Sequence, residues 1–414
     1  MTNTLVLLPY LKNENDIRTP KARLEEVTSL TKAIDLNVIE SQLVPLSEIR
    51  ANAFIGKGTI EKYVSLIKEN EVEVVIMACP LSPLQQRNLE KAWNTKVIDK
   101  TALILEIFGK RARTKEGVLQ VELAHLTYAR SRLVRSWTHL ERQRGGSGFL
   151  GGPGETQIEL DRRLIDEDII KIKKELADVK KTRHLHRSAR KKIPFPVVAL
   201  VGYTNAGKST LFNKLTHADV MAKDMLFATL DPTMRRIKLP SGQEVILSDT
   251  VGFISDLPTE LVMAFRATLE EVLDADVIVH VRDYYHEDST AQRIDVENVL
   301  SDLGLKEMVD EGLIEALNKI DLFAEDDLNM ILEQKKRRPK ECPLSAHTGQ
   351  GFDKLLNCIE EALNKDAKEV HLQIPVTDGK ALAQIYQKAQ VLNRKDTQKV
   401  IKLDVKIKES ELFY

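Results

Sequence analysis

The chain of 414 residues has only three cysteines and no recognisable cysteine pattern. Cys79, Cys342 and Cys358 are scattered along the sequence and lack metal-ligand spacing, which argues against a disulfide framework and a cysteine-based metal site. We interpret them as small buried or free thiols in a reducing compartment. The expected location is therefore cytoplasmic.

The sequence also lacks long apolar runs and a charge imbalance. No run approaches the roughly 18 apolar residues of a spanning helix, and the first residues lack the basic start and cleavage site of a secretory leader. We therefore expect no stable membrane insertion. The net charge is −1, so any affinity for nucleic acid must come from local patches.

The most specific stretch is a glycine-containing loop between an apolar strand and a helix. Val197–Val201 is apolar and mostly β-branched, as in a buried parallel strand, and the pattern G-x-x-x-x-G-K-S follows it. Backbone N–H groups of such a loop point at phosphate oxygens. Lys208 would add a charge at the β- and γ-phosphates, and Ser209 would offer its hydroxyl to Mg²⁺. The predicted phosphate-binding residues are Gly202, Tyr203, Thr204, Asn205, Ala206, Gly207, Lys208 and Ser209.

Three later motifs, each after a predicted strand, indicate a guanine nucleotide. Asp249, Thr250, Val251 and Gly252 form D-x-x-G, whose acid can hold the Mg²⁺ shell through water and whose glycine can offer an N–H to the γ-phosphate. The carboxylate of Asp321, in the motif N-K-I-D, can accept two hydrogen bonds from N1–H and the amino group of guanine, a donor pair that adenine lacks. The remaining candidate base contacts are Asn318, Lys319, Ile320 and Asp321, followed by Ser345, Ala346 and His347.

A threonine-containing segment lies between the phosphate-binding loop and Asp249. Such a segment can bring a hydroxyl to Mg²⁺ while the γ-phosphate is present and release it on hydrolysis. Thr229 is our first choice and Thr233 the alternative, while a plain Asp-Pro turn fits the stretch about as well. The candidate residues are Phe227, Ala228, Thr229, Leu230 and Asp231.

Strands alternate with helices in two parts of the chain, which indicates an α/β protein with mainly parallel sheets. We predict an N-terminal α/β domain over 1–110, an antiparallel helical hairpin over 111–193, and a nucleotide-binding domain over 194–365. That domain would have a mixed, mainly parallel sheet with helices on both faces. A small α+β unit over 366–414 would complete the chain, and a glycine-rich loop over 145–157 would join the two hairpin helices.

The predicted hairpin is basic and has an apolar pair in its loop. Leucines from Leu119 and isoleucines from Ile165 recur at heptad-like spacing, as in two helices that pack together. The loop, with Phe149 and Leu150 at its centre, is either a flexible connector or a segment that inserts into a partner. Clusters of Lys and Arg beside it are either a solvated face, as most charge runs are, or a footprint for RNA. We favour RNA.

The nucleotide motifs G-Y-T-N-A-G-K-S, F-A-T-L-D-P-T, D-T-V-G-F, N-K-I-D and S-A-H resemble the G domain of translation-factor-related GTPases. Together with G-G-S-G-F-L-G-G-P-G-E-T-Q before them, they make essentially the whole chain similar to the HflX family of ribosome-associated GTPases in the Obg–HflX superfamily. The resemblance implies a P-loop GTPase that binds GTP and GDP, with Ser209 and Thr229 on Mg²⁺. It also implies a partnership with the large ribosomal subunit and its rRNA, and the splitting or rescue of stalled ribosomes under stress. We expect a monomer.

Four residues are the candidates for catalysis: Lys208, Thr229, Gly252 and Asn205. Where many GTPases have a glutamine after D-x-x-G, this chain has Phe253, which can neither orient nor polarise water. Intrinsic hydrolysis should therefore be slow and need a partner or an ion. Asn205 either ligates K⁺ beside the phosphates or only shapes the turn. Alternative functions are an RNA-remodelling factor tuned by nucleotide and a signalling GTPase with protein partners.

Overall fold

The computed structural model describes residues 2–12, 17–143, 153–190, 195–217, 227, 233–255, 272–365, 367–379, 381–382, 385, 390–397 and 399–408. The chain separates into two compact units. The first contains 1–183, 225–230 and 256–265, and the second contains 184–224, 231–255 and 266–414. Among the described residues, no helix combines the length and the apolarity that crossing a bilayer requires.

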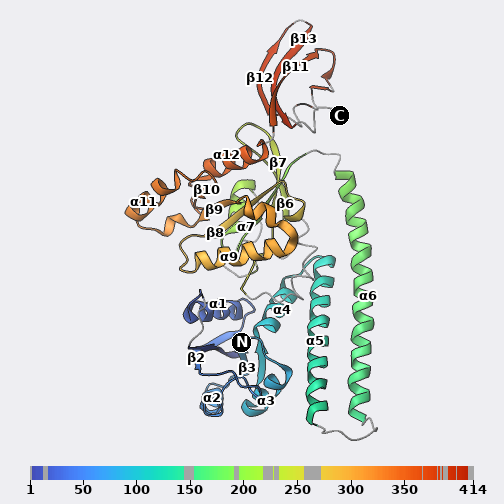
Figure 1. Cartoon of the computed structure of the whole chain (residues 1–414), viewed down its shortest axis with the longest axis vertical. Helices are drawn as coiled ribbons and strands as arrows, with labels where there is room; N and C mark the ends of the chain where they lie inside the picture. Colours follow the sequence, from blue (N-terminus) through green and yellow to red (C-terminus); the bar gives the residue numbers. More distant parts are fainter. Residues whose placement is uncertain are drawn as a thin grey trace. The chain divides into compact units, whose positions relative to one another are not determined.

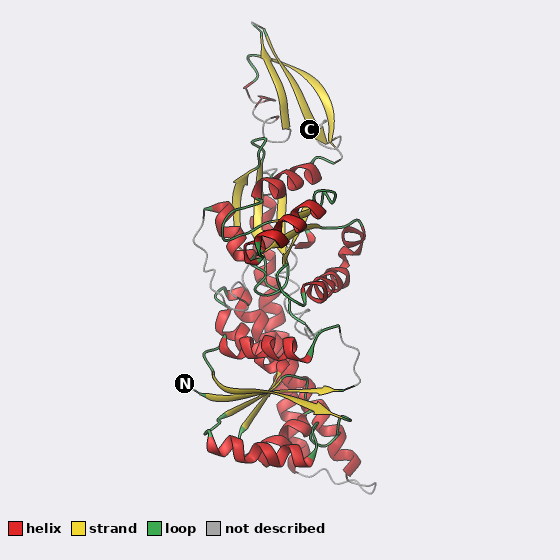
Figure 2. Cartoon of the chain, turned by 90° about the vertical axis from the view of Figure 1, so that its left-hand side faces the viewer, coloured by secondary structure: helices red, strands yellow, loops and turns green. Residues whose placement is uncertain are grey.

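The first unit begins with a four-stranded parallel sheet in the order β2-β1-β3-β4, which confirms the predicted parallel α/β arrangement (Figure 2). Every residue from Thr4 to Pro9 is buried, because helices cover both faces of the sheet. The strands are β1 (Asn3–Leu11), β2 (Asn37–Leu46), β3 (Val74–Met77) and β4 (Lys96–Asp99).

Four helices pack on this sheet (Figure 1). Tyr63 and Trp93 come from two of them and meet edge to face in the core beside Leu5 and Leu7. Local signals explain where the helices begin. Ser82 forms a capping box with Gln85. The helices are α1 (Pro20–Lys32), α2 (Lys57–Glu69), α3 (Pro83–Trp93) and α4 (Lys100–Arg111).

Two long helices follow, α5 (Lys115–Gln143) and α6 (Pro153–Arg190). They run antiparallel, because Leu119 clusters with Leu176 near one end while Arg130 pairs with Asp166 nearer the other. This cluster confirms the predicted seam of leucines and isoleucines between the two helices, whose ribbons lie side by side in Figure 1. The predicted loop over 145–157 extended too far, since α6 already begins at Pro153. Proline is favoured in the first turn, where its missing N–H costs nothing.

The second unit contains a six-stranded sheet in the order β10-β9-β8-β5-β7-β6. All pairs are parallel except β6 with β7, which confirms the predicted mixed sheet. The chain order reverses at the central strand β5, and in such sheets a ligand lies beyond the carboxyl ends of the strands at this point. The strands are β5 (Val197–Val201), β6 (Thr233–Lys238), β7 (Glu244–Asp249), β8 (Val277–Asp283), β9 (Ile314–Asn318) and β10 (Glu341–Pro343).

Helices of this unit include one that directly follows β5 and one that follows β10. The first begins right after Gly207, and the second has a strongly amphipathic sequence that buries Leu355, Ile359 and Leu363 against the sheet. The α-helices that the structure describes here are α7 (Lys208–Thr216), α9 (Ser289–Leu300), α10 (Lys306–Asp310), α11 (Glu325–Lys335) and α12 (Phe352–Leu363).

The last part of the chain forms a three-stranded antiparallel sheet, β11 (Ala367–Pro375), β12 (Gln390–Asp396) and β13 (Val400–Lys408), in the order β11-β13-β12. Leu403 and Val405 are buried in its small core. Apolar residues alternate through Val370–Pro375 and Val400–Ile407, which predicts the strands β11 and β13, whereas β12 has no such pattern and is missed. Its Q-V-L-N-R-K-D sequence lacks regular alternation, because it is an edge strand whose residues from Asn393 onward are exposed.

Candidate functional site

The loop after β5 has the geometry of a phosphate-binding loop. Gly202 has a φ of 154°, and a Cβ added there would lie 2.1 Å from the Val281 carbonyl oxygen. Gly207 has a φ of 93°, and its added Cβ would lie 2.2 Å from Nδ2 of Asn318. Both positions therefore require glycine, since any side chain would collide with the neighbouring strand ends. Asn205, at the turn between them, is exposed with a φ of 61°.

Lys208 is the first residue of α7 and folds back over the loop. Its Nζ donates to the carbonyl oxygens of Gly202, at 3.1 Å, and Tyr203, at 2.8 Å. Burial lowers the pKa of Lys208 to about 8, although the negative charge of Asp249 opposes this shift. The ammonium group is thus desolvated beside the loop, where an anionic phosphate would favour its charged form.

Ser209 and the D-x-x-G motif meet beside the same loop. The Ser209 hydroxyl donates to Oδ2 of Asp249 at 2.7 Å, across a sequence separation of 40 residues. A Cβ on Gly252 would lie 2.9 Å from Cγ2 of Thr204 and 3.1 Å from Nζ of Lys208. A hydroxyl, a carboxylate and a lysine therefore converge on one point, which suits a divalent cation and a phosphate chain.

Phe253 is held in place by the backbone of the loop. Its N–H donates to the Gly202 carbonyl oxygen at 3.1 Å, and its own carbonyl accepts the Thr204 N–H at 2.7 Å. The residue is only 2% exposed. The hydroxyl of Tyr203 accepts the Ser255 N–H at 2.7 Å, which fastens the segment a second time. The position after D-x-x-G is therefore occupied by a packed ring and offers no polar side-chain group.

Asn318 connects the phosphate-binding loop with the S-A-H loop. Its Nδ2 donates to the Ala206 carbonyl oxygen at 2.8 Å, and its Oδ1 accepts the Ala346 N–H at 2.8 Å. Asn318, Ala206 and Ala346 are all buried. Three segments that are up to 140 residues apart in the sequence are thereby held together by a single side chain.

The other N-K-I-D and S-A-H residues divide into buried anchors and exposed groups. Ile320 and Ser345 are fully buried, whereas Asp321 and His347 are exposed and available to a ligand. Lys319 has a φ of 68°, and its Nζ pairs with Oδ2 of Asp283 at 2.7 Å. Asp283 ends β8 and was not among the predicted site residues, because only the tertiary structure brings that strand end beside Lys319.

Part of the predicted threonine-containing segment lies outside the described residues, namely Ala228, Thr229, Leu230 and Asp231. Phe227 is described and belongs to the first unit, where its ring meets the ring of Phe108 edge to face at a centroid distance of 4.7 Å. It is 2% exposed. Thr233, the alternative threonine, is the first residue of β6 and pairs in register with Asp249.

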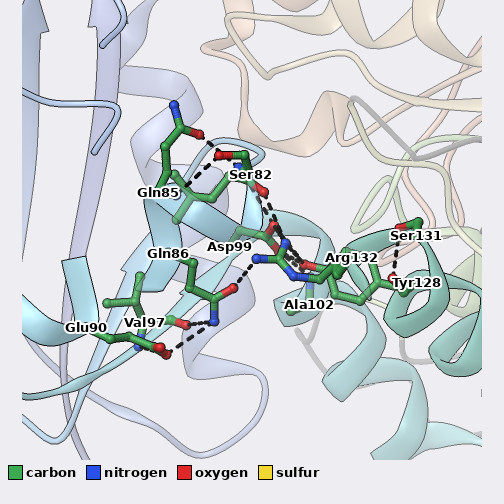
Figure 3. Close-up of polar contacts among 11 residues, drawn as sticks. Ser82, Gln85, Gln86, Glu90, Val97, Asp99, Ala102, Tyr128, Ser131 and Arg132 are labelled. Carbon is green, nitrogen blue, oxygen red and sulfur yellow. Dashed lines mark hydrogen bonds and ion pairs between the residues drawn. The ribbon is translucent and has the colours of Figure 1, made fainter. Parts of the chain in front are cut away.

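Two arginines of the basic stretch in the predicted hairpin, Arg130 and Arg132, make ion pairs within the chain, and Figure 3 shows the contacts of Arg132. Arg132 donates to Asp99 at 3.3 Å, to the Tyr128 hydroxyl at 2.8 Å and to the Leu81 carbonyl oxygen at 3.1 Å, and it also contacts the Gln86 amide oxygen. These bonds fasten α5 to the parallel sheet. Arg130 pairs with Asp166 of α6 at 3.0 Å. Both cations serve intramolecular contacts that the sequence did not reveal.

Comparison with known proteins gives matches along the chain. A GTP-binding GTPase N-terminal model matches residues 21–109, a GTP-binding GTPase middle region model 111–190, a 50S ribosome-binding GTPase model 197–319, and an HflX C-terminal domain model 330–412. The GTPase HflX of Magnetococcus marinus is 49% identical over 369 residues, which cover 89% of this chain and 84% of that protein. The chain belongs to the HflX family of GTPases.

The GTPase HflX of Escherichia coli is 43% identical over 364 residues, covering 88% of this chain and 84% of that protein. A solved structure of SsGBP in complex with GDP is 23% identical and has a TM-score of 0.48, covering 88% of this chain and 99% of the other. This HflX-family chain is accordingly an enzyme that binds GTP and hydrolyses it to GDP and phosphate.

Proposed function

We propose that this GTPase binds the large ribosomal subunit and splits or rescues stalled ribosomes under stress, acting as a cytoplasmic monomer. The observation that carries the proposal is the buried ring of Phe253, since it leaves the position after D-x-x-G without a group to orient water. Rapid hydrolysis then depends on groups that come from outside the chain. The match of 197–319 to a 50S ribosome-binding GTPase model supports the large subunit as their source.

We assign the following roles to the site residues. Backbone N–H groups of 202–209 and Nζ of Lys208 would hold the phosphates, and the Gly252 N–H would meet the γ-phosphate. Asp321 would select guanine through its two carboxylate oxygens. The Ala346 N–H, which the sequence suggested for the guanine oxygen, donates instead to Oδ1 of Asn318 and would hold the S-A-H loop beside the base. Lys319, held by Asp283, would cover the base with its methylene stem.

Magnesium would be held by the hydroxyls of Ser209 and Thr229, with Asp249 in the surrounding shell. The donor set fits, because oxygen ligands suit Mg²⁺ and the Ser209 hydroxyl already lies 2.7 Å from Oδ2 of Asp249. When bound, the ion neutralises charge on the β- and γ-phosphates. Its loss with a chelator should weaken nucleotide binding.

We also propose that the hairpin over 111–193 contacts rRNA through the basic end of α6 rather than through its middle. The lysines in the middle of α6 lie between acidic residues on both sides along the chain, and Arg163 there pairs with Glu159. From 179 to 192 the sequence carries seven Lys or Arg and no acid. We also propose that the chain has four domains, over 1–110, 111–193, 194–365 and 366–414. The glycine-rich segment over 145–157 would help the hairpin to contact the ribosomal partner.

The decisive experiment compares GTP turnover of the full chain with and without purified large ribosomal subunits. We expect stimulation of at least about tenfold, because a partner must supply the missing positioning. Dissociation of intact ribosomes, followed by light scattering, should require GTP. If large subunits leave the turnover unchanged, a signalling GTPase or a nucleotide-tuned RNA-remodelling factor explains the chain better.

Two triple variants with reversed charges test the contact with RNA. Replacing Arg183, Arg187 and Arg190 by Glu should weaken binding to large subunits and flatten its salt dependence. The matched control replaces Lys171, Lys173 and Lys174, three exposed cations in the middle of the same helix. Equal effects of the two triple variants would refute a specific role for the basic end.

A further inference from the structure

Two of the three cysteines form a pair in the second unit, although the sequence separates them by 16 residues. Cys342 lies on β10 and Cys358 on α12, and their Sγ atoms are 3.3 Å apart. Cys342 is fully buried, whereas Cys358 is half-buried and lines a cavity of about 620 Å³ together with Lys340, Glu361 and Ala362. A small oxidant can therefore reach Cys358 first.

The contacts of the pair give the two sulfurs different reactivity. The Cys342 thiol donates its hydrogen to Sγ of Cys358, and this bond lowers the pKa of Cys358 although burial and the charge of Glu361 oppose the shift. Lys354, on the preceding helical turn, also lowers this pKa, and the Cys358 thiol donates to the Pro339 carbonyl oxygen at 3.0 Å. The same hydrogen bond, together with burial, raises the pKa of Cys342. Since the thiolate is the nucleophile, Cys358 is the sulfur that attacks.

The pair lies at the base of the loop that carries Ser345, Ala346 and His347. This loop leaves β10, turns through 344–351 and enters α12, so that a bond between the two cysteines would close a ring around it. The Leu344 N–H donates to the Leu317 carbonyl oxygen at 2.9 Å, which holds the β10 side to the sheet. The α12 side is therefore the one that must move.

Little room exists for that movement. Forming the bond brings the sulfurs from 3.3 Å to about 2.05 Å, an approach of about 1.2 Å. At the start of α12, a Cβ on Gly351 would already lie 2.2 Å from the Pro343 carbonyl oxygen and 3.0 Å from Cα of Leu344. A shift of α12 toward β10 presses on Leu344, the neighbour of Ser345, and so disturbs the loop that the proposed function places beside guanine.

We propose that Cys342 and Cys358 are a redox-sensitive dithiol, which a peroxide converts into a disulfide that weakens the hold of the 345–347 loop on guanine nucleotide. The Cys358 thiolate attacks one peroxide oxygen, the O–O bond breaks, and hydroxide leaves, giving a sulfenic acid. The Cys342 sulfur then attacks that sulfur, the S–O bond breaks, and water departs with the Cys342 proton. In sum, two thiols and one hydrogen peroxide give one disulfide and two waters.

The test treats the full chain with hydrogen peroxide and counts free thiols under denaturing conditions. We expect a fall from three thiols to one, with a peptide cross-link between Cys342 and Cys358. Cys79 should stay reduced because it is 7% exposed and burial raises its pKa. A loss of all three thiols, or of none, or a cross-link between chains would overturn the proposal.

The functional half of the test measures release of a fluorescent GDP. Release from the oxidised chain should be about fivefold faster or more, within the usual range of coupling between two sites. Dithiothreitol should restore the slow rate, which separates the disulfide from methionine oxidation. Cys358→Ser and Cys342→Ala should release GDP at the slow rate of the untreated wild type, with or without peroxide. Cys79→Ser should respond to peroxide as the wild type does. An unchanged rate in fully cross-linked protein would refute the coupling.

Discussion

Asn318 is the side chain on which the nucleotide site most depends for its assembly, and its replacement by alanine is the sharpest test. The amide joins the Ala206 carbonyl oxygen and the Ala346 N–H through two hydrogen bonds of 2.8 Å. Alanine removes the amide nitrogen and the amide oxygen that make these two hydrogen bonds. The carbonyl and the N–H are left in buried surroundings, where each unsatisfied group costs about 1 to 3 kcal/mol.

The expected loss in the free energy of unfolding of the second unit is therefore about 2 to 5 kcal/mol, allowing for partial relaxation. Because the same side chain positions the phosphate-binding loop and the S-A-H loop, part of this loss should appear in nucleotide affinity. If about 1.4 kcal/mol of the loss appears in the free energy of GDP binding, the affinity for GDP falls tenfold. Urea unfolding gives the first quantity, and titration with a fluorescent GDP gives the second.

Asn298→Ala is the matched control, because Asn298 is exposed on α9 in the same unit. It should change the free energy of unfolding by less than about 0.5 kcal/mol and leave GDP affinity unaltered. If Asn318→Ala behaves like this control in both measurements, the two buried hydrogen bonds do not hold the site together. A stability loss with unchanged GDP affinity would limit the bridge to a structural role.

The other predictions concern charge, an ion and the anchoring of the hairpin. The lowered pKa of Lys208, about 8 against 10.5 when unfolded, means that the unfolded chain binds more protons between these values. Without nucleotide, stability should thus rise by about 3 kcal/mol from pH 8 to 10.5, and Lys208→Met should remove this rise in pH-dependent urea unfolding. If Asn205 ligates K⁺, hydrolysis should be faster in KCl than in NaCl and Asn205→Ala should abolish the difference; equal wild-type rates would contradict the ion's role. Asp99→Asn should destabilise the first unit by about 3 kcal/mol, as seen by urea unfolding, because it leaves the partly buried Arg132 without its carboxylate, whereas Tyr128→Phe should cost about 1 kcal/mol.

Much of the fold was predictable because its signals are local. Apolar strands alternate with amphipathic helices in two stretches, and such alternation leads to parallel sheets in both. The G-x-x-x-x-G-K-S pattern is likewise contiguous, so its loop conformation depends mainly on neighbouring residues. The β12 strand was missed because an exposed edge strand has few side chains in the core and hence little pattern.

The order of the motifs along the chain predicted which segments form the nucleotide site, because each follows a strand and the carboxyl ends of parallel strands share one edge. The contacts between segments were not predictable in the same way. The pairing of Lys319 with Asp283, the sequestration of Arg132 by Asp99 and the meeting of Cys342 with Cys358 each join residues from different elements. Sequence spacing carries no information about such distances.

The sequence by itself determined the class of the protein: the strand–loop–helix at 197–210 and the residues after the later strands indicate a guanine-nucleotide site, and their chemistry depends on residue type and local order. Only the tertiary structure decided which groups are free to act. Strand order and helix packing bring distant charges and thiols together, and each pairing removes a group from solvent or gives it a reactive neighbour. For this reason Arg132 became an internal anchor, and two scattered cysteines became a pair at the base of the 345–347 loop.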